Sequence, residues 1–175
     1  MMNRPTGIAF GVRGGEPMLV FADTFNNRIR AFRLGDAQVV TLSGTGPDSI
    51  TADGSLAVDA TFVNITDVAY DASGNAYVAD NGGFVVRRIT PDGRISTVAG
   101  TGEVPLDAAE NSVTEQPATT TAISSPVSLA IDKAQPDRYL YIATWGPGYQ
   151  VLRLDLQAGT IRRYAGNGFG TAGDG

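Results

Sequence analysis

The 175-residue sequence is 42% hydrophobic, which is enough for an ordinary folded core and excludes a disordered chain. It contains no cysteine and no histidine, so disulfides, thiolate metal sites and a histidine general base are excluded within it. A formal net charge of −5 argues against a nucleic-acid partner.

The first unit of the chain spans residues 5–46 and reads as four short strands. Met1–Pro5 lacks the apolar core of a signal peptide, so we expect any export segment to lie outside this sequence. After a first strand that begins at Pro5, the sequence predicts strands over Met18–Ala22, Arg28–Phe32 and Val39–Leu42. A connector over residues 47–63 follows.

The second unit, residues 64–102, has the clearest strand and turn signals. We predict strands over Val68–Tyr70, Ala76–Ala79, Val85–Thr90 and Arg94–Ala99. Turn residues rich in Gly, Asn, Asp and Pro separate them, and no stretch is long enough for a crossover helix. The sheet should therefore be antiparallel, and a second connector spans residues 103–124.

The third unit, residues 125–168, repeats the pattern with strands predicted over Tyr139–Ala143, Val151–Asp155 and Ile161–Ala165. Residues 169–175 then resemble the start of another connector, which predicts that the chain is a fragment of a longer repeat protein. No run approaches the roughly 18 apolar residues of a membrane span, so we expect none.

Equivalent positions mark the repeat. Ala22, Ala79 and Ala143 correspond, as do Gly44, Gly100 and Gly166, and the connector stretch Leu56–Phe62 aligns with Pro117–Ile123. Four-stranded units repeated head to tail are the signature of a β-propeller. The predicted fold is an all-β propeller of four-stranded antiparallel blades, with three blades present as an open half-propeller.

Several of these stretches resemble the NHL-repeat family of β-propellers. They are Pro5–Ala9, Ala22-Asp23 with Asn26–Arg30, Gly74–Asp80 and Ile95–Gly102. The resemblance implies a ring of six blades, of which three are present, and an extracytoplasmic or secreted location. In the third unit Thr144-Trp145 replaces the Asp that the first two have, and Leu152 replaces the Arg found at Arg30 and Arg87.

The loops between the second and third strands hold the candidate site, because in an NHL-like blade they share a face with the connectors. Asp23 and Asp80, with Asn26 and Asn81, offer oxygen ligands to a hard cation such as calcium, and Asn27 belongs to the same candidate ligand-binding face. The same residue types also accept backbone N–H bonds within their own turns. Both interpretations stay open at the sequence level.

Aromatic and basic residues give two further candidates. Trp145 and Tyr149 lie in a Gly/Pro loop that suits contact with a flat ligand or a protein, or packing on the next blade. Arginines recur on the third strands. A basic stripe there predicts an anionic ligand or RNA, the alternative is solvent-facing side chains that cover the sheet, and the acidic net charge favours the second. These arginines are Arg28, Arg30, Arg87, Arg88 and Arg153.

We predict a non-catalytic ligand- or protein-binding module of a longer protein, with no catalytic residue and no cofactor other than calcium. The alternative is a propeller enzyme, a lyase or a calcium-dependent lactonase, whose site is completed by missing blades. Open end blades also predict self-association of the half-ring. The apolar residues expected to be partly exposed there are Ile8, Phe10, Leu129 and Ile131.

Overall fold

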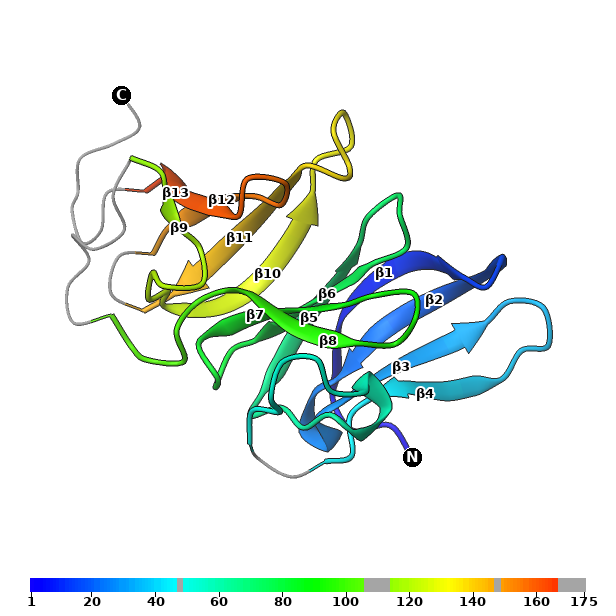
Figure 1. Ribbon diagram of the computed structural model, residues 1–175. Helices are drawn as coiled ribbons and strands as arrows, with labels where there is room; N and C mark the ends of the chain where they lie inside the picture. The colour runs from blue at the N-terminus through cyan, green and yellow to red at the C-terminus, as the bar shows by residue number, and fades with distance from the viewer. Residues whose placement is uncertain (47–48, 106–113, 147–148, 167–175) are drawn as a thin grey trace.

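The computed structural model describes residues 1–46, 49–105, 114–146 and 149–166 and contains three antiparallel sheets, arranged like a fan (Figure 1). In blade 1 the strand order is β1 (Pro5–Arg13), β2 (Glu16–Asp23), β3 (Arg28–Arg33) and β4 (Val39–Ser43). Blade 2 has β5 (Ile65–Tyr70), β6 (Ala76–Asp80), β7 (Val85–Ile89) and β8 (Ile95–Ala99). Blade 3 has β10 (Ser125–Ile131), β11 (Tyr139–Trp145), β12 (Val151–Asp155), β13 (Thr160–Ala165) and, at its edge, β9 (Gln116–Pro117).

The predicted fold class is confirmed. The only helices among the described residues are two short 3₁₀ turns, η1 (Thr24–Asn26) and η2 (Ala57–Asp59). No helix in the described part of the chain is long and apolar enough to cross a membrane. The predicted start of a third connector, residues 169–175, lies outside the described residues.

Strand register confirms that the three units are equivalent. Ala22 faces Ile29 across the second and third strands of blade 1, and Ala79 and Ala143 hold the same places in blades 2 and 3. The first strand of every blade also carries one extra residue near its start. Such a bulge bends a strand, and its recurrence means that corresponding side chains point to corresponding faces.

Glycine closes each blade where the chain leaves the fourth strand. Gly44 and Gly100 have φ angles of +101° and +91°, a region that L-residues with a side chain rarely adopt. A Cβ at either position would also collide with a backbone carbonyl oxygen, that of Asn27 or Phe84. The predicted blade-ending turns are therefore required by both conformation and space.

Each connector pairs with the outermost strand of the blade that follows it. In the first, Leu56 forms a bridge with Arg94 beside β8, and in the second, Pro117 of β9 pairs with Thr160 of β13. These contacts fall at the aligned stretches of the two connectors. The connectors therefore cover sheet edges that would otherwise have unpaired backbone groups.

The two sides of a blade have different neighbours. We call the side toward the preceding blade the rear face and the side toward the following blade the front face. Along a strand successive side chains alternate between them. In β5, Val68 packs in the core shared with blade 1, whereas Ala69 packs in the core shared with blade 3.

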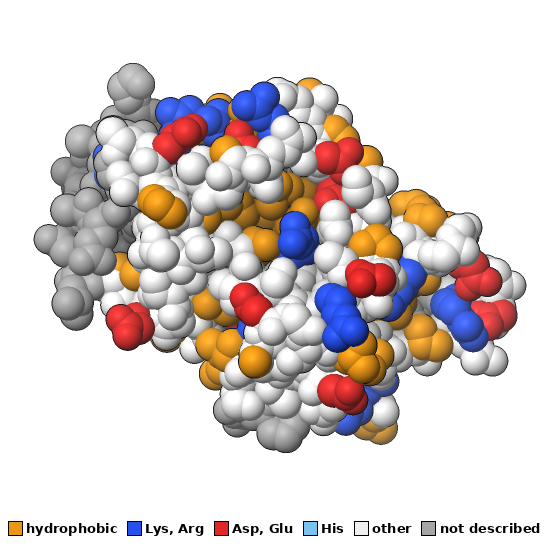
Figure 2. All heavy atoms as spheres, viewed as in Figure 1, with side chains coloured by type: hydrophobic (Ala, Val, Ile, Leu, Met, Phe, Trp, Pro, Cys, Tyr) orange, Lys and Arg blue, Asp and Glu red, His pale blue; other side chains and the backbone are white. Residues whose placement is uncertain are grey.

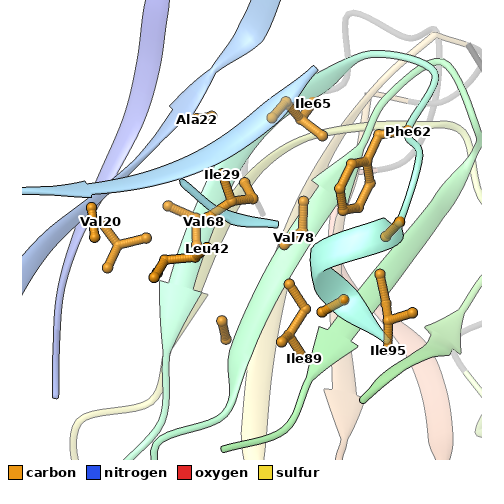
Figure 3. Packing of buried hydrophobic residues seen from close by; sticks show 14 of the residues in the cluster. Val20, Ala22, Ile29, Leu42, Phe62, Ile65, Val68, Val78, Ile89 and Ile95 are labelled. Atoms are coloured by element: carbon orange, nitrogen blue, oxygen red, sulfur yellow. The ribbon is translucent and has the colours of Figure 1, made fainter. Parts of the chain in front are cut away.

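Two apolar cores lie between the blades. The first joins blade 1, the first connector and blade 2, and Figure 3 shows its side chains converging from all three. Its labelled members are Val20, Ala22, Ile29, Leu42, Phe62, Ile65, Val68, Val78, Ile89 and Ile95. The second joins blades 2 and 3 and includes Ala69, Tyr77, Val86, Leu129, Leu140, Ile142, Leu152 and Leu154.

The expected exposure of apolar residues on the first strands is right for blade 1 and wrong for blade 3. Ile8 and Phe10 are exposed, but Leu129 is buried and Ile131 packs partly buried against the second core. Leu129 and Ile131 lie on the rear face, toward blade 2, and Ala130 is the exposed residue between them. Apolar alternation identifies two faces but does not say which one has a neighbour.

Candidate functional site

The predicted site lies at one end of the fan. The loops from the second to the third strand of each blade lie with the two connectors along the left and bottom of Figure 1, opposite the β1–β2, β5–β6 and β10–β11 turns. We call this end the connector face. Its described loop residues are 24–27, 81–84, 145–146 and 149.

Asp23 ends β2 and is fully buried. Its carboxylate accepts the backbone N–H of Asn3 at 2.6 Å, the side-chain amide of Asn26 at 2.8 Å and Nε of Arg30 at 2.6 Å. Burial raises the pKa of Asp23, but these hydrogen bonds outweigh it and the pKa lies below its ordinary value. Asp23 therefore ties the N-terminal segment to strand β3.

Asp80 holds the equivalent position in blade 2 with different partners. Its carboxylate accepts the backbone N–H groups of Val63, at 3.1 Å, and Asn64, at 2.9 Å, where the first connector enters β5. Burial raises the pKa of Asp80, although these N–H bonds, one from Gly83 and the charge of Arg87 act against the rise. Asp80 therefore fixes the junction between a connector and its blade.

Both carboxylates are occupied by groups of the chain itself. Within the described residues no three Asp, Glu, His or Cys side chains gather in a way that could hold a metal ion. Calcium takes six to eight oxygen ligands, and Asp23 and Asp80 belong to separate blades. The arrangement is the one expected for structural carboxylates that accept N–H bonds.

The three candidate asparagines also bridge segments. Asn26 donates to the carbonyl of Met1 as well as to Asp23, and Asn27 donates to the carbonyl of Val63 at 3.3 Å. Asn81 donates to the carbonyl of Pro126 in blade 3, at 3.3 Å. Asn27 and Asn81 thus join a loop to the segment next along the ring.

The interpretation of the arginines as solvent-facing is wrong for Arg87, which is 1% exposed. Its guanidinium donates to the carbonyl of Thr51 at 2.8 Å and to Asp53 at 3.1 Å, beneath the first connector. Burial lowers the pKa of Arg87, and the charges of Asp53 and Asp80 oppose that change. A connector more than thirty residues away in sequence covers this side chain, and strand periodicity does not report it.

The other candidate arginines are partly buried and do not form a basic stripe on the visible surface. Figure 2 shows acidic and basic side chains interspersed across this view. Arg30 pairs with Asp23, and Arg153 lies 3.5 Å from Glu115. Arg28 donates instead to the carbonyl of Thr45, at 3.3 Å, and the view shows no concentrated positive surface.

Blade 3 presents aromatic groups in place of the acid. Thr144 is buried and closes its own loop through Gln150, with an Oγ1–O distance of 3.3 Å. The next residue, Trp145, is 63% exposed, and Tyr149 is 54% exposed. The two predicted aromatic residues are therefore exposed on the connector face, in a loop that the neutral side chain of Thr144 holds in place of an acid.

Phe25, in the corresponding loop of blade 1, is a third exposed aromatic residue that the sequence reasoning missed. It is 59% exposed, and the guanidinium of Arg4 lies 5.0 Å from its ring centre. The signal that points to it is its place two residues after Asp23, inside the repeated loop.

The last residue of each of these loops has a left-handed backbone conformation in every blade. Asn27, Phe84 and Tyr149 have φ angles of +47°, +53° and +37° and lie at the end of each loop, before the third strand. Asn tolerates this region, whereas an aromatic residue there is strained by about 1–3 kcal/mol. Gly would avoid that strain, so the aromatic residues at 84 and 149 make these two loops less stable than Gly would.

Neither a family model nor a curated protein matches this chain. Solved structures do. A gluconolactonase from Xanthomonas campestris superposes with a TM-score of 0.61 and 17% identity over 93% of this chain and 47% of that one. Virginiamycin B lyase from Staphylococcus aureus gives 0.53 and 15% over 91% and 40%, and nidogen in its complex with laminin gives 0.58 and 13% over 94% and 49%.

These structures are six-bladed β-propellers, and the three sheets of this chain match about half of such a ring. The chain spans less than half the length of each of the three. At such identities the likeness shows the fold alone. The neighbours include enzymes and a protein solved with its binding partner, so the choice of function depends on the residues described above.

Proposed function

We propose that this chain is part of an NHL-type propeller that binds a protein partner, without catalysis, through the exposed aromatic side chains of its connector face. The repeated stretches of sequence support the NHL assignment. The observation that carries the binding proposal is a contrast within the loops of this face: Asp23 and Asp80 are buried and bonded within the chain, while Phe25, Trp145 and Tyr149 are each more than half exposed.

The composition of the loops supports a protein partner. They combine Phe, Trp and Tyr with Gly, Asn and Thr. The same combination serves in antibody loops, where rigid aromatic side chains supply contact area at low entropic cost and small polar residues supply adaptable hydrogen bonds. Aromatic residues are also enriched among the energetic anchors of protein interfaces.

A displayed peptide library tests this proposal. Twelve-residue peptides selected on the immobilised chain are titrated against it in solution, and binding is followed by the fluorescence of Trp145, the single Trp of the sequence. Calorimetry then compares Tyr149→Ala with Tyr164→Ala, because Tyr164 is 56% exposed on the last strand of the same blade. We expect affinity to fall at least tenfold in the first variant and to stay unchanged in the second.

Two results would overturn the proposal. One is a set of peptides that bind both variants as well as they bind the unmodified chain. The other is turnover of glucono-δ-lactone by the chain in the presence of calcium, which would assign it to the lactonase class instead. The lactone is the probe because a gluconolactonase shares the fold.

A further inference from the structure

The two junctions between blades are built from corresponding positions, which can be compared residue by residue. In each junction the rear face of the following blade is apolar and contributes to the core. The corresponding pairs on these rear faces are Val68 and Leu129, Val78 and Ile142, and Ile89 and Leu154. The front faces that they cover differ between blade 1 and blade 2.

The front face of blade 1 is apolar from its inner to its outer strands. Val20 of β2 pairs with Ala31 of β3, and Ala31 pairs with Val40 of β4. Val20, Ala31 and Leu42 are buried in the first core, and Val40 packs against it. The apolar packing of the first junction therefore extends to the outermost strand of the blade.

The same positions in blade 2 include polar groups. Tyr77 is paired with Arg88, and Arg88 is paired in turn with Ser96. Val98 takes the place of Leu42, beside the bulge in each fourth strand. Arg88, Ser96 and Val98 are only partly buried. A guanidinium and a hydroxyl thus lie where blade 1 has Ala and Val, so the outer part of the second junction is less completely packed.

A pocket of about 210 Å³ lies at this outer part, between blades 2 and 3. Figure 2 shows apolar side chains in a hollow between these two blades. A buried apolar cavity of about 150 Å³ is large enough to bind benzene, so the pocket has room for one ring. Strand β8, the end of β12, the β12–β13 turn and the second connector line it, with Thr97, Val98, Leu154, Asp155, Leu156, Gly159 and Thr119.

The guanidinium of Arg88 lacks an acceptor on the front face of blade 2. Its Nε is buried without a hydrogen bond, and the group forms no ion pair with any described residue. The acids of this junction have other donors: Asp71 accepts the hydroxyl of Tyr77 at 2.8 Å, and Asp155 accepts Nε of Arg138 at 3.2 Å. A buried donor normally has a partner, which a bound anion would supply here.

We propose that the pocket between blades 2 and 3 binds a small organic carboxylate, with its apolar ring against Val98 and Leu154 and its carboxylate bound by Arg88. Neighbouring strands lie roughly 4.8 Å apart, and residues two apart on a strand about 6.6 Å. Since Arg88 pairs with Ser96, two residues before Val98, the long arginine side chain and a ring with a short chain span this separation. Arginine binds a carboxylate through two parallel hydrogen bonds.

Both walls of the pocket are strands of this chain, so neither wall depends on further blades. None of its lining residues belongs to the connector-face loops proposed to bind a protein. The two sites are therefore independent, and either proposal can fail without the other.

Titration of the chain with 3-phenylpropanoate, followed by amide shifts in nuclear magnetic resonance, tests the proposal. We expect saturable shifts at β8 and at the end of β12. Arg88→Gln should weaken binding roughly tenfold or more, because a charged hydrogen-bond donor is lost. Arg94→Gln is the matched control, since Arg94 is an exposed arginine of the same blade, and it should leave the affinity unchanged.

Two further measurements separate the charge from the cavity. The alcohol 3-phenylpropan-1-ol has the same ring and chain without the carboxylate and should bind roughly tenfold more weakly. Val98→Phe fills the pocket and should abolish the shifts, with Val98→Leu in its place if circular dichroism shows the first variant unfolded. No saturable shift at the pocket of the unmodified chain, equal affinities for the acid and the alcohol, or equal losses in Arg88→Gln and Arg94→Gln would overturn the proposal.

Discussion

Replacement of Asp80 by alanine should destabilise the propeller through the junction between the first connector and β5. The carboxylate accepts the N–H groups of Val63 and Asn64 at 2.9–3.1 Å and is fully buried. Hydrogen bonds to a charged group contribute about 1.5–3 kcal/mol each. Since both donors are only partly buried, water recovers some of this, and burial already disfavours the ionised carboxylate.

The expected net loss is about 3 kcal/mol, which lowers the melting temperature of a chain of this size by roughly 6–12 °C. Urea unfolding followed by circular dichroism measures it, at one fixed protein concentration because association shifts apparent stability. Asp92→Ala is the control, since Asp92 is exposed, and should change stability by less than about 0.5 kcal/mol.

Two results would refute this reasoning. In one, Asp80→Ala melts within a degree of the unmodified chain, so the carboxylate does not hold the junction. In the other, calcium binds the unmodified chain saturably in calorimetry and the binding disappears in Asp80→Ala. The carboxylate would then be a metal ligand, as the sequence alone allowed.

Three further predictions concern other parts of the blades. The folded pKa of Asp23 is lowered from 3.8, so the stability that its ionised carboxylate contributes is present above that pH and is lost as pH falls through the folded pKa. The loss of unfolding free energy in Asp23→Asn, measured by urea unfolding, should therefore shrink in acid. The loss in Asp80→Asn should grow in acid, because the folded pKa of Asp80 is raised. Arg87→Leu should lower stability by less than about 1.5 kcal/mol, because its partner Asp53 is half exposed, yet should speed amide exchange in the first connector; slow exchange there would contradict the role of Arg87. Gly100→Ala should lose about 2–4 kcal/mol through strain and collision, whereas Gly54→Ala, at φ +85° in open space, should lose about 1 kcal/mol, and equal losses would show that the collision is unimportant.

The blade pattern could be predicted from the sequence because it rests on local chemistry. Strand propensity and turn residues placed the strands of all three units close to their observed bounds, as for Val151–Asp155. The repeated Ala and Gly positions predicted which residues of the three blades correspond, since the turn after each fourth strand holds a left-handed Gly. The candidate loops also fell on one face, as predicted.

Contacts between distant segments could not be predicted in this way. The burial of Arg87 depends on where the first connector passes, and that path is set by pairing with β8. The partners of Asp80 likewise come from the entry to β5 and not from its own turn alone. Leu129 was misplaced because alternation along one strand does not say which side the preceding blade occupies.

The most direct test of the proposed function is a map of the binding site by nuclear magnetic resonance. Amide shifts of the chain are recorded with and without the tightest peptide from the displayed library. We predict changes confined to the loop residues 24–27, 81–84, 145–146 and 149 of the connector face. Changes centred on β1, β5 and β10, or on the opposite end of the blades, would contradict the assignment of this face as the binding surface.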